Sequence, residues 1–167
     1  MRIKVLLAVW LLPLILFTAA ANPAENKKEF KTEEPMTNAR LETILRRVEP
    51  GVKGGDGRWQ MMREGVPLLV LTDEPHNRMR IIAPAAEIKD VNRDRLMRMT
   101  EANFATALDA RYAAFKGVMW AAFIHPLDSL RERDLLSALQ QVINLVKTAG
   151  TTYSSSELQF GPPYEEN

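Results

Sequence analysis

The chain has 167 residues, a length that favours a single domain with one hydrophobic core. Its 22 Lys and Arg residues nearly balance 21 Asp and Glu residues, and 46% of the residues are hydrophobic, which is typical of a globular protein. This balance disfavours disordered chains and nucleic-acid binders that depend on bulk positive charge. The sequence contains no cysteine, which excludes thiolate nucleophiles, zinc–thiolate sites and disulfides.

Residues 1–21 have the three parts of a cleavable secretory signal peptide. Two basic residues precede an apolar run over residues 5–17, which is shorter than the roughly 20 residues of a membrane-spanning helix. Ala19 and Ala21 fit the A-x-A rule for the cleavage site. We therefore expect cleavage after Ala21. The alternative is an uncleaved N-terminal anchor, because the apolar character continues through the alanines.

The expected destination is the periplasm or the extracellular medium, where a chain without cysteine cannot mispair thiols. Cleavage leaves 20 basic and 21 acidic residues, a net charge of −1. No stable membrane insertion is expected after cleavage. Residues 22–35 are rich in Lys and Glu and lack a helical or strand period, which predicts a flexible linker before a domain that begins at residue 36.

The first regular element of this domain is an amphipathic helix that ends at Pro50. Its apolar residues keep the spacing i, i+3, i+4 and i+7: Leu41, Ile44, Leu45 and Val48. Thr37 or Asn38 can cap its N-terminus. The glycine-rich run 54–57 lacks the Lys-Ser/Thr pair and the following helix of a phosphate-binding loop, so we interpret it as a flexible turn.

Strands and two further helices follow. The strand-like patterns cover residues 59–61, 66–71, 79–83, 111–115 and 118–124. Asp90 or Asn92 caps a second helix, and a third begins near Ser129. Residues 148–167, rich in Thr, Ser and Pro, predict a disordered tail. The expected fold over residues 36–147 is α+β: an antiparallel sheet of about five strands with three helices, in the order α-β-β-β-α-β-β-α.

Short motifs in turns, core positions and a helix entry accompany this order. They are Arg58-Trp59, Gly65-Val66-Pro67, Asn77-Arg78-Met79-Arg80, Asn103-Phe104, Ala110-Arg111-Tyr112, Gly117-Val118-Met119-Trp120 and Pro126-Leu127-Asp128-Ser129-Leu130. With these motifs, the stretch of about residues 36–147 resembles the class I type III secretion chaperones and their relatives, the YbjN-type sensory-transduction-regulator family. The resemblance implies a small homodimeric adaptor that binds extended segments of a client protein and catalyses no reaction. The export signal departs from those chaperones, which work in the cytosol.

Apolar side chains on both faces of the strands are the physical reason to expect a protein partner. The expected lining of the partner-binding groove is Trp59, Met61, Leu68 and Val70, with Leu41 and Leu45 alongside. In the last strand, one of two opposed faces should meet a second subunit or the second helix. The expected dimer interface is Met119, Ala121 and Phe123, opposed by Val118, Trp120, Ala122 and Ile124. Because the mature charge is near zero, we expect affinity for the client to depend weakly on salt.

The alternative function is a periplasmic enzyme or metal-binding protein that uses the loop with Asp73, Glu74 and His76, or His125 at a strand end. Carboxylates and an imidazole can hold a metal ion or act as a general base. In a Pro-containing loop between antiparallel strands, however, these residues are more typical of a solvated turn, and the sequence contains no nucleophile motif. We therefore expect no enzymatic activity, no cofactor and no metal.

A nucleic-acid-binding function would use a patch of five arginines, with Trp59 or Trp120 as a stacking surface: Arg78, Arg80, Arg93, Arg95 and Arg98. The last three of these arginines cluster at the start of the second helix. The balanced charge and the export signal favour a solvated helix face instead. No nucleic-acid partner is therefore expected.

Overall fold

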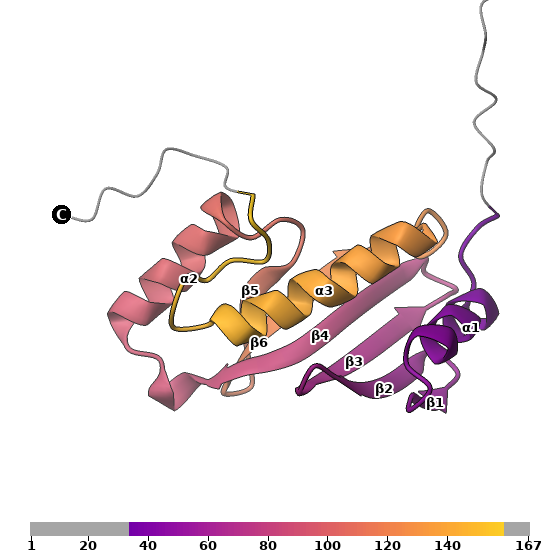
Figure 1. Cartoon of the computed structure of the whole chain (residues 1–167), viewed down its shortest axis with the longest axis horizontal. Coiled ribbons are helices and arrows are strands. Elements are labelled where there is room, and N and C mark those ends of the chain that lie inside the picture. Colours follow the sequence, from indigo (N-terminus) through magenta and orange to yellow (C-terminus); the bar gives the residue numbers. More distant parts are fainter. Residues whose placement is uncertain (1–33, 159–167) are drawn as a thin grey trace, which may run out of the picture. The chain divides into compact units, whose positions relative to one another are not determined.

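The fold is seen in a computed structural model that describes residues 34–158. The predicted signal peptide, almost all of the predicted linker and residues 159–167 lie outside the described residues. Within the described range, no helix is long and apolar enough to cross a membrane. The elements shown in Figure 1 are α1 (Asn38–Val48), β1 (Lys53–Gly55), β2 (Arg58–Arg63), β3 (Val66–Asp73), β4 (Arg78–Glu87), the 3-10 turn η1 (Ile88–Asp90), α2 (Arg93–Ala105), β5 (Arg111–Phe115), β6 (Val118–His125) and α3 (Glu132–Thr148).

The strands form one six-stranded antiparallel sheet in the order β1-β2-β3-β4-β6-β5. The predicted α+β fold is confirmed, with one strand more than the five expected. The additional strand is β1, which overlaps the run interpreted as a flexible turn and is too short for a period-2 pattern. Gly54 has a φ of +101°, and a Cβ there would lie 2.2 Å from the carbonyl oxygen of Arg58. Only glycine therefore allows β1 to pair this closely with β2.

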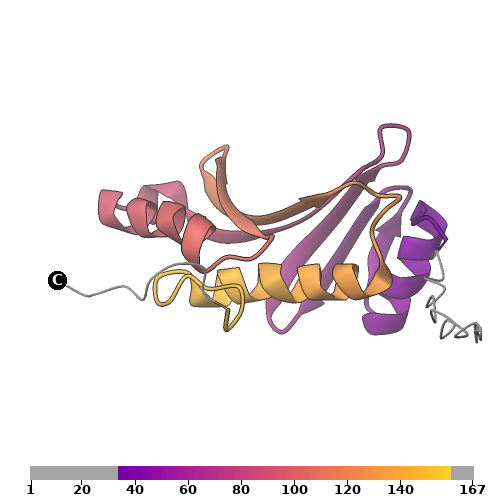
Figure 2. The same cartoon turned by 90° about the horizontal axis from the view of Figure 1, so that it is seen from above.

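Helices α1 and α3 lie on the same face of the sheet, and the core fills the space between them and the strands (Figure 2). From α3, a stripe of fully buried residues faces the strands: Leu135, Leu139, Val142 and Ile143. The strands contribute alternate residues, among them Val70 and Ile81, both with no exposed surface. One face of the sheet is thus buried by the chain's own helices.

Two helices begin where the sequence predicts. Thr37 and Asn92 cap α1 and α2 through side-chain oxygens, which accept hydrogen bonds of 3.3 and 2.8 Å from backbone N–H groups three residues further on. Helix α3 begins at Glu132 rather than near Ser129. The preceding irregular turn buries Leu127, and this tertiary contact takes the place of the predicted first helical turn.

Residues 149–158 form a C-terminal strap, which corrects the prediction of a disordered tail for this part of the chain. Tyr153 and Ser155 are 4% and 2% exposed. The Ser155 hydroxyl accepts a hydrogen bond of 2.7 Å from the backbone N–H of Leu108, and its own N–H donates to the Thr106 carbonyl at 3.2 Å. These partners are far away in the sequence, so no local period of a Thr- and Ser-rich stretch could predict them.

Side chains bind backbone groups at both edges of the sheet. At β1, the Arg46 guanidinium donates to the carbonyl oxygens of Val52 at 3.2 Å and Gly54 at 3.0 Å. At β5, the Asn103 amide donates to the Tyr112 carbonyl at 3.1 Å and accepts from the Tyr112 N–H at 2.7 Å. At Tyr112, Asn103 therefore makes the two hydrogen bonds that a neighbouring strand would otherwise make.

Candidate protein-binding face

The pairing register assigns each strand residue to one of two faces, because side chains directly opposite each other across a sheet share a face. We call the face without α1 and α3 the open face (Figure 2). One row of paired residues on it runs through Lys53, Gln60, Leu69, Ile82, Ala122 and Arg111. Apolar residues occupy the middle of this row and charged residues its two ends.

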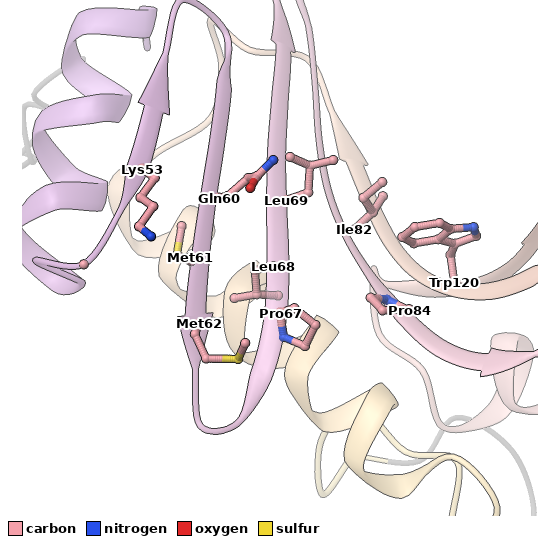
Figure 3. Close-up of a pocket in the computed structure, with 11 residues that line it drawn as sticks. Lys53, Gln60, Met61, Met62, Pro67, Leu68, Leu69, Ile82, Pro84 and Trp120 are labelled. Atoms are coloured by element: carbon pink, nitrogen blue, oxygen red, sulfur yellow. The ribbon is translucent and has the colours of Figure 1, made fainter.

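The open face holds an apolar groove of about 420 Å³ (Figure 3). Leu69 of β3 and Ile82 of β4 project from adjacent strands, and the Trp120 ring of β6 lies next to Ile82 and Pro84. The residues that line the groove are Gly51, Lys53, Gln60, Met61, Met62, Pro67, Leu68, Leu69, Ile82, Pro84 and Trp120. The groove is thus lined by residues of five neighbouring strands, β1, β2, β3, β4 and β6.

The groove is accessible and its largest side chain is held in place. Leu69, Ile82 and Trp120 are half-buried, whereas Met62 at one end is 60% exposed. The Trp120 indole N–H donates a hydrogen bond of 3.2 Å to the carbonyl of Phe115. This bond orients the ring, so an apolar side chain of a partner meets a preformed surface.

The six residues predicted to line a partner-binding groove lie in the core instead. Each is at most 5% exposed: Trp59, Met61, Leu68, Val70, Leu41 and Leu45. They lie between the sheet and its helices, and only Met61 and Leu68 border the groove, from beneath the open face. The prediction thus identified strands β2 and β3 correctly but named the alternate residues that face the core instead of those on the open face. The available signal was Arg58 and Gln60, since polar residues mark the solvent side of a strand.

The predicted dimer interface is corrected in the same way. Met119, Ala121 and Phe123 are 2%, 0% and 4% exposed, because α3 of the same chain covers them. The opposed residues of β6 lie on the open face, where Ile124 is 60% exposed. Met119, Ala121 and Phe123 are therefore not available for a contact between subunits.

A second apolar surface lies on α2. Leu96, Met97 and Phe104 are 43%, 50% and 81% exposed. Met97 and Phe104 are two helical turns apart, so they share one side of the helix. Only Met99 and Ala102 of this helix are buried, and most of the α2 surface is therefore open to a partner.

The basic cluster on α2 holds the C-terminal strap. Arg95 donates to the carbonyl of Ala149 at 3.5 Å. The guanidinium of Arg98 lies 5.9 Å from the ring centroid of Tyr153, and its Nε donates to the Tyr153 hydroxyl at 3.5 Å. Two of the three arginines in this cluster thus make intramolecular contacts, and Arg93 is exposed. Of the other two arginines weighed for nucleic-acid binding, Arg78 donates to the Asn77 carbonyl at 3.2 Å and Arg80 is exposed.

The loop proposed for metal binding or catalysis forms a hydrogen-bonded turn. His76 Nδ1 lies 2.8 Å from Asp73 Oδ1, and the backbone N–H of His76 donates to the same oxygen at 3.2 Å. The hydrogen bond from His76 lowers the pKa of Asp73. Glu74 is exposed, and His125 stacks on Phe123 with ring centroids 5.9 Å apart. Within residues 34–158, no group of three His, Asp or Glu side chains is placed to hold a metal ion.

Comparisons with known proteins find the fold in solved structures. No protein-family model matches the sequence, and no curated protein matches it significantly. The Yersinia pestis type III secretion chaperone SycH, solved with a stable fragment of YscM2, is similar with a TM-score of 0.54 at 12% identity, over 67% of this chain and 98% of that chain.

Two further complexes contain similar chains. In the HopA1–SchA chaperone–effector complex the TM-score is 0.53 at 15% identity, over 65% of this chain and 88% of that chain. In the ExsC–ExsE complex it is 0.53 at 11% identity, over 67% of this chain and 92% of that chain. At such identities the likeness is one of fold. The chain therefore has the α+β fold of the type III secretion chaperones, as its motifs implied.

Proposed function

We propose that this protein is a non-enzymatic, chaperone-like adaptor that binds an extended apolar segment of a partner protein on the open face. The observation that carries the proposal is an apolar groove on a sheet face that α1 and α3 leave uncovered. The solved neighbours support it, because one is a chaperone in complex with a protein fragment and another is a chaperone–effector complex. The self-contained turn of Asp73 and His76 gives no comparable support to an enzyme.

The groove is large enough to supply useful affinity. Leu69, Ile82 and Trp120 offer contact to two or three partner side chains across neighbouring strands. Burying one large apolar side chain is worth about 1.5 to 3 kcal/mol. Two or three such anchors suffice for micromolar binding after the cost of association.

The proposal also includes export of the protein and its membership of the YbjN-type family. The basic residues, short apolar run and A-x-A site of residues 1–21 support export to the periplasm or medium and cleavage after Ala21. The motifs quoted for the YbjN-type family support membership of that family. An exported adaptor of this fold serves a client outside the cytosol.

We further propose that the protein is a homodimer, and we place the contact on α2 rather than on the covered face of β6. The exposed side of α2 with Met97 and Phe104 supports this choice. A self-complementary contact between two such helices would bury these side chains.

Site-specific photo-crosslinking in intact cells tests the adaptor function. A photoreactive residue at Leu69 lies in the groove, whereas one at Thr43 lies on the exposed side of α1 and serves as the matched control. We expect a discrete protein adduct from position 69 that is absent from position 43 and is lost in an Ile82→Ser background. Equal adducts from both positions, or none from position 69, would contradict the proposal.

A further inference from the structure

We propose that the client segment bound on the open face alternates apolar and acidic residues, because arginines border the apolar groove. This inference rests on the proposed function and specifies the chemistry of the client. It concerns Arg58 and Arg80, which the hypothesis of an apolar adaptor did not use.

A basic row lies next to the groove. Arg58, Leu71 and Arg80 are paired across β2, β3 and β4, and the row continues to Ile124 of β6. Adjacent strands lie about 4.8 Å apart, so the Cα atoms of the two arginines are roughly 10 Å apart, on either side of Leu71. Both arginines are exposed. A carboxylate placed above Leu71 is within reach of both guanidinium groups.

The groove has a further cation at its β1 end. Lys53 begins the row that continues through Leu69 and Ile82, and it is exposed at the rim (Figure 3). The apolar floor therefore has positive charge along one side and at one end. Such a border selects among client segments that are equally apolar.

The open face offers these cations no acidic partner of its own. Among the described strand residues, acidic side chains occur on this face only at strand ends, at Asp73 and Glu87. No carboxylate within residues 34–158 lies at ion-pair distance from Lys53, Arg58 or Arg80. The charge on this face is thus available to a ligand.

The spacing of the rows suits an extended peptide. Successive rows on one face are two residues apart along each strand, which is about 7 Å. A segment that lies across the strands between the rows of Leu69 and Leu71 can direct alternate side chains to the groove and to the arginines. A segment with acidic residues at every second position fits this arrangement, whereas lysines there would face like charges.

This inference replaces the expectation of weak salt dependence. That expectation came from the net charge of the whole chain, whereas binding depends on the charges next to the groove. Salt screens exposed charges over about 10 Å at 0.1 M and about 3 Å at 1 M. The affinity for an acidic client should therefore fall as ionic strength rises.

The experiment uses three synthetic peptides with the same apolar residues at alternate positions and Glu, Ser or Lys between them, titrated onto the full-length protein. At low ionic strength we expect the Glu peptide to bind roughly tenfold more tightly than the Ser peptide, and the Lys peptide to bind most weakly. High salt should reduce these differences. The double variant Arg58→Gln/Arg80→Gln should weaken the Glu peptide roughly tenfold and leave the Ser peptide unchanged.

The matched control is Lys89→Gln/Arg93→Gln, which removes the same charge from exposed residues beyond the end of β4. Loss of the Glu preference in this control as well would overturn the inference. Equal binding of all three peptides, lost in Ile82→Ser, would overturn it and leave the adaptor function standing. Binding of no peptide would overturn it too, and photo-crosslinking then judges the adaptor function separately. Stronger arginine-dependent binding of phosphatidylglycerol vesicles or single-stranded DNA would assign the face to a different ligand.

Discussion

The assignment of the two sheet faces can be tested at neighbouring residues of β3. Val70 has no exposed surface and lies in the core, whereas Leu69 is half-buried in the groove of the open face. Replacing each in turn by serine makes a similar chemical change one residue apart in the same strand. The two variants should therefore separate stability from binding.

The magnitudes follow from burial. Val70→Ser removes a fully buried side chain, worth about 1.5 to 3 kcal/mol, and buries a hydroxyl, which costs about 1 to 3 kcal/mol more if unpaired. We expect the free energy of unfolding to fall by about 3 kcal/mol or more. Leu69→Ser keeps its site half-solvated, and a loss of about 1 kcal/mol is expected. Client binding should show the reverse order, with a loss of roughly tenfold or more only for Leu69→Ser.

Urea denaturation followed by circular dichroism measures the first effect, with the same slope m required of both variants. Titration of the Ser peptide measures the second, because this probe depends on the groove and not on the arginines. Equal destabilisation by the two substitutions would refute the assignment of faces. Unchanged peptide binding by a folded Leu69→Ser variant would refute the position of the groove.

The remaining predictions concern processing, the core, self-association and pH. N-terminal sequencing of the exported protein should give Asn22, and a sequence starting at the initiator methionine would favour the anchored alternative. Gln141→Leu should lower the free energy of unfolding by about 2 to 5 kcal/mol, because the Gln141 oxygen accepts two backbone N–H bonds, at 2.9 and 3.1 Å, in the loop before β5. Phe104→Ser should convert the proposed dimer to a monomer in light scattering. A variant that keeps the mass of a dimer would show that the interface is not on α2. The hydrogen bond from Lys147 lowers the pKa of Glu64, so the contribution of this contact to stability is present above the ordinary pKa of a glutamate and is lost as the pH falls through the lowered value. Glu64→Gln should therefore flatten the acid limb of a thermal-stability profile.

The sequence predicted the local features of the fold, and the tertiary contacts lay beyond it. The caps Thr37 and Asn92 and the helical periods depend on residues close to each other in the chain, so they could be predicted. Which alternate residues of β2 and β3 face the core depends on where α1 and α3 pack. The sequence did not show this, because both faces of these strands carry apolar residues. The strap around Tyr153 is held by Thr106 and Leu108, some 47 residues away, through bonds that no local pattern encodes.

The sequence predicted that the candidate site is an apolar groove on the strands, but the residues named for it lie in the core. The strands carry more apolar residues than three helices can cover, which correctly predicted an uncovered apolar face. Leu69, Ile82 and Trp120 line the groove on that face. The charge beside the groove was not predicted, because Arg58 and Arg80 are more than twenty residues apart in sequence and come together only through the register of three strands.

The covered edges have a consequence for the proposed adaptor, which binds extended segments: its own edge strands must not pair with those of a second copy. Edge strands of a second copy are the nearest extended segments in any concentrated solution, and they present unpaired backbone groups. Arg46 occupies the outward carbonyls of Val52 and Gly54, and Asn103 occupies both backbone groups of Tyr112. A client segment can therefore bind in the groove, whereas a strand of a second copy cannot pair with these backbone groups, because they are already hydrogen-bonded.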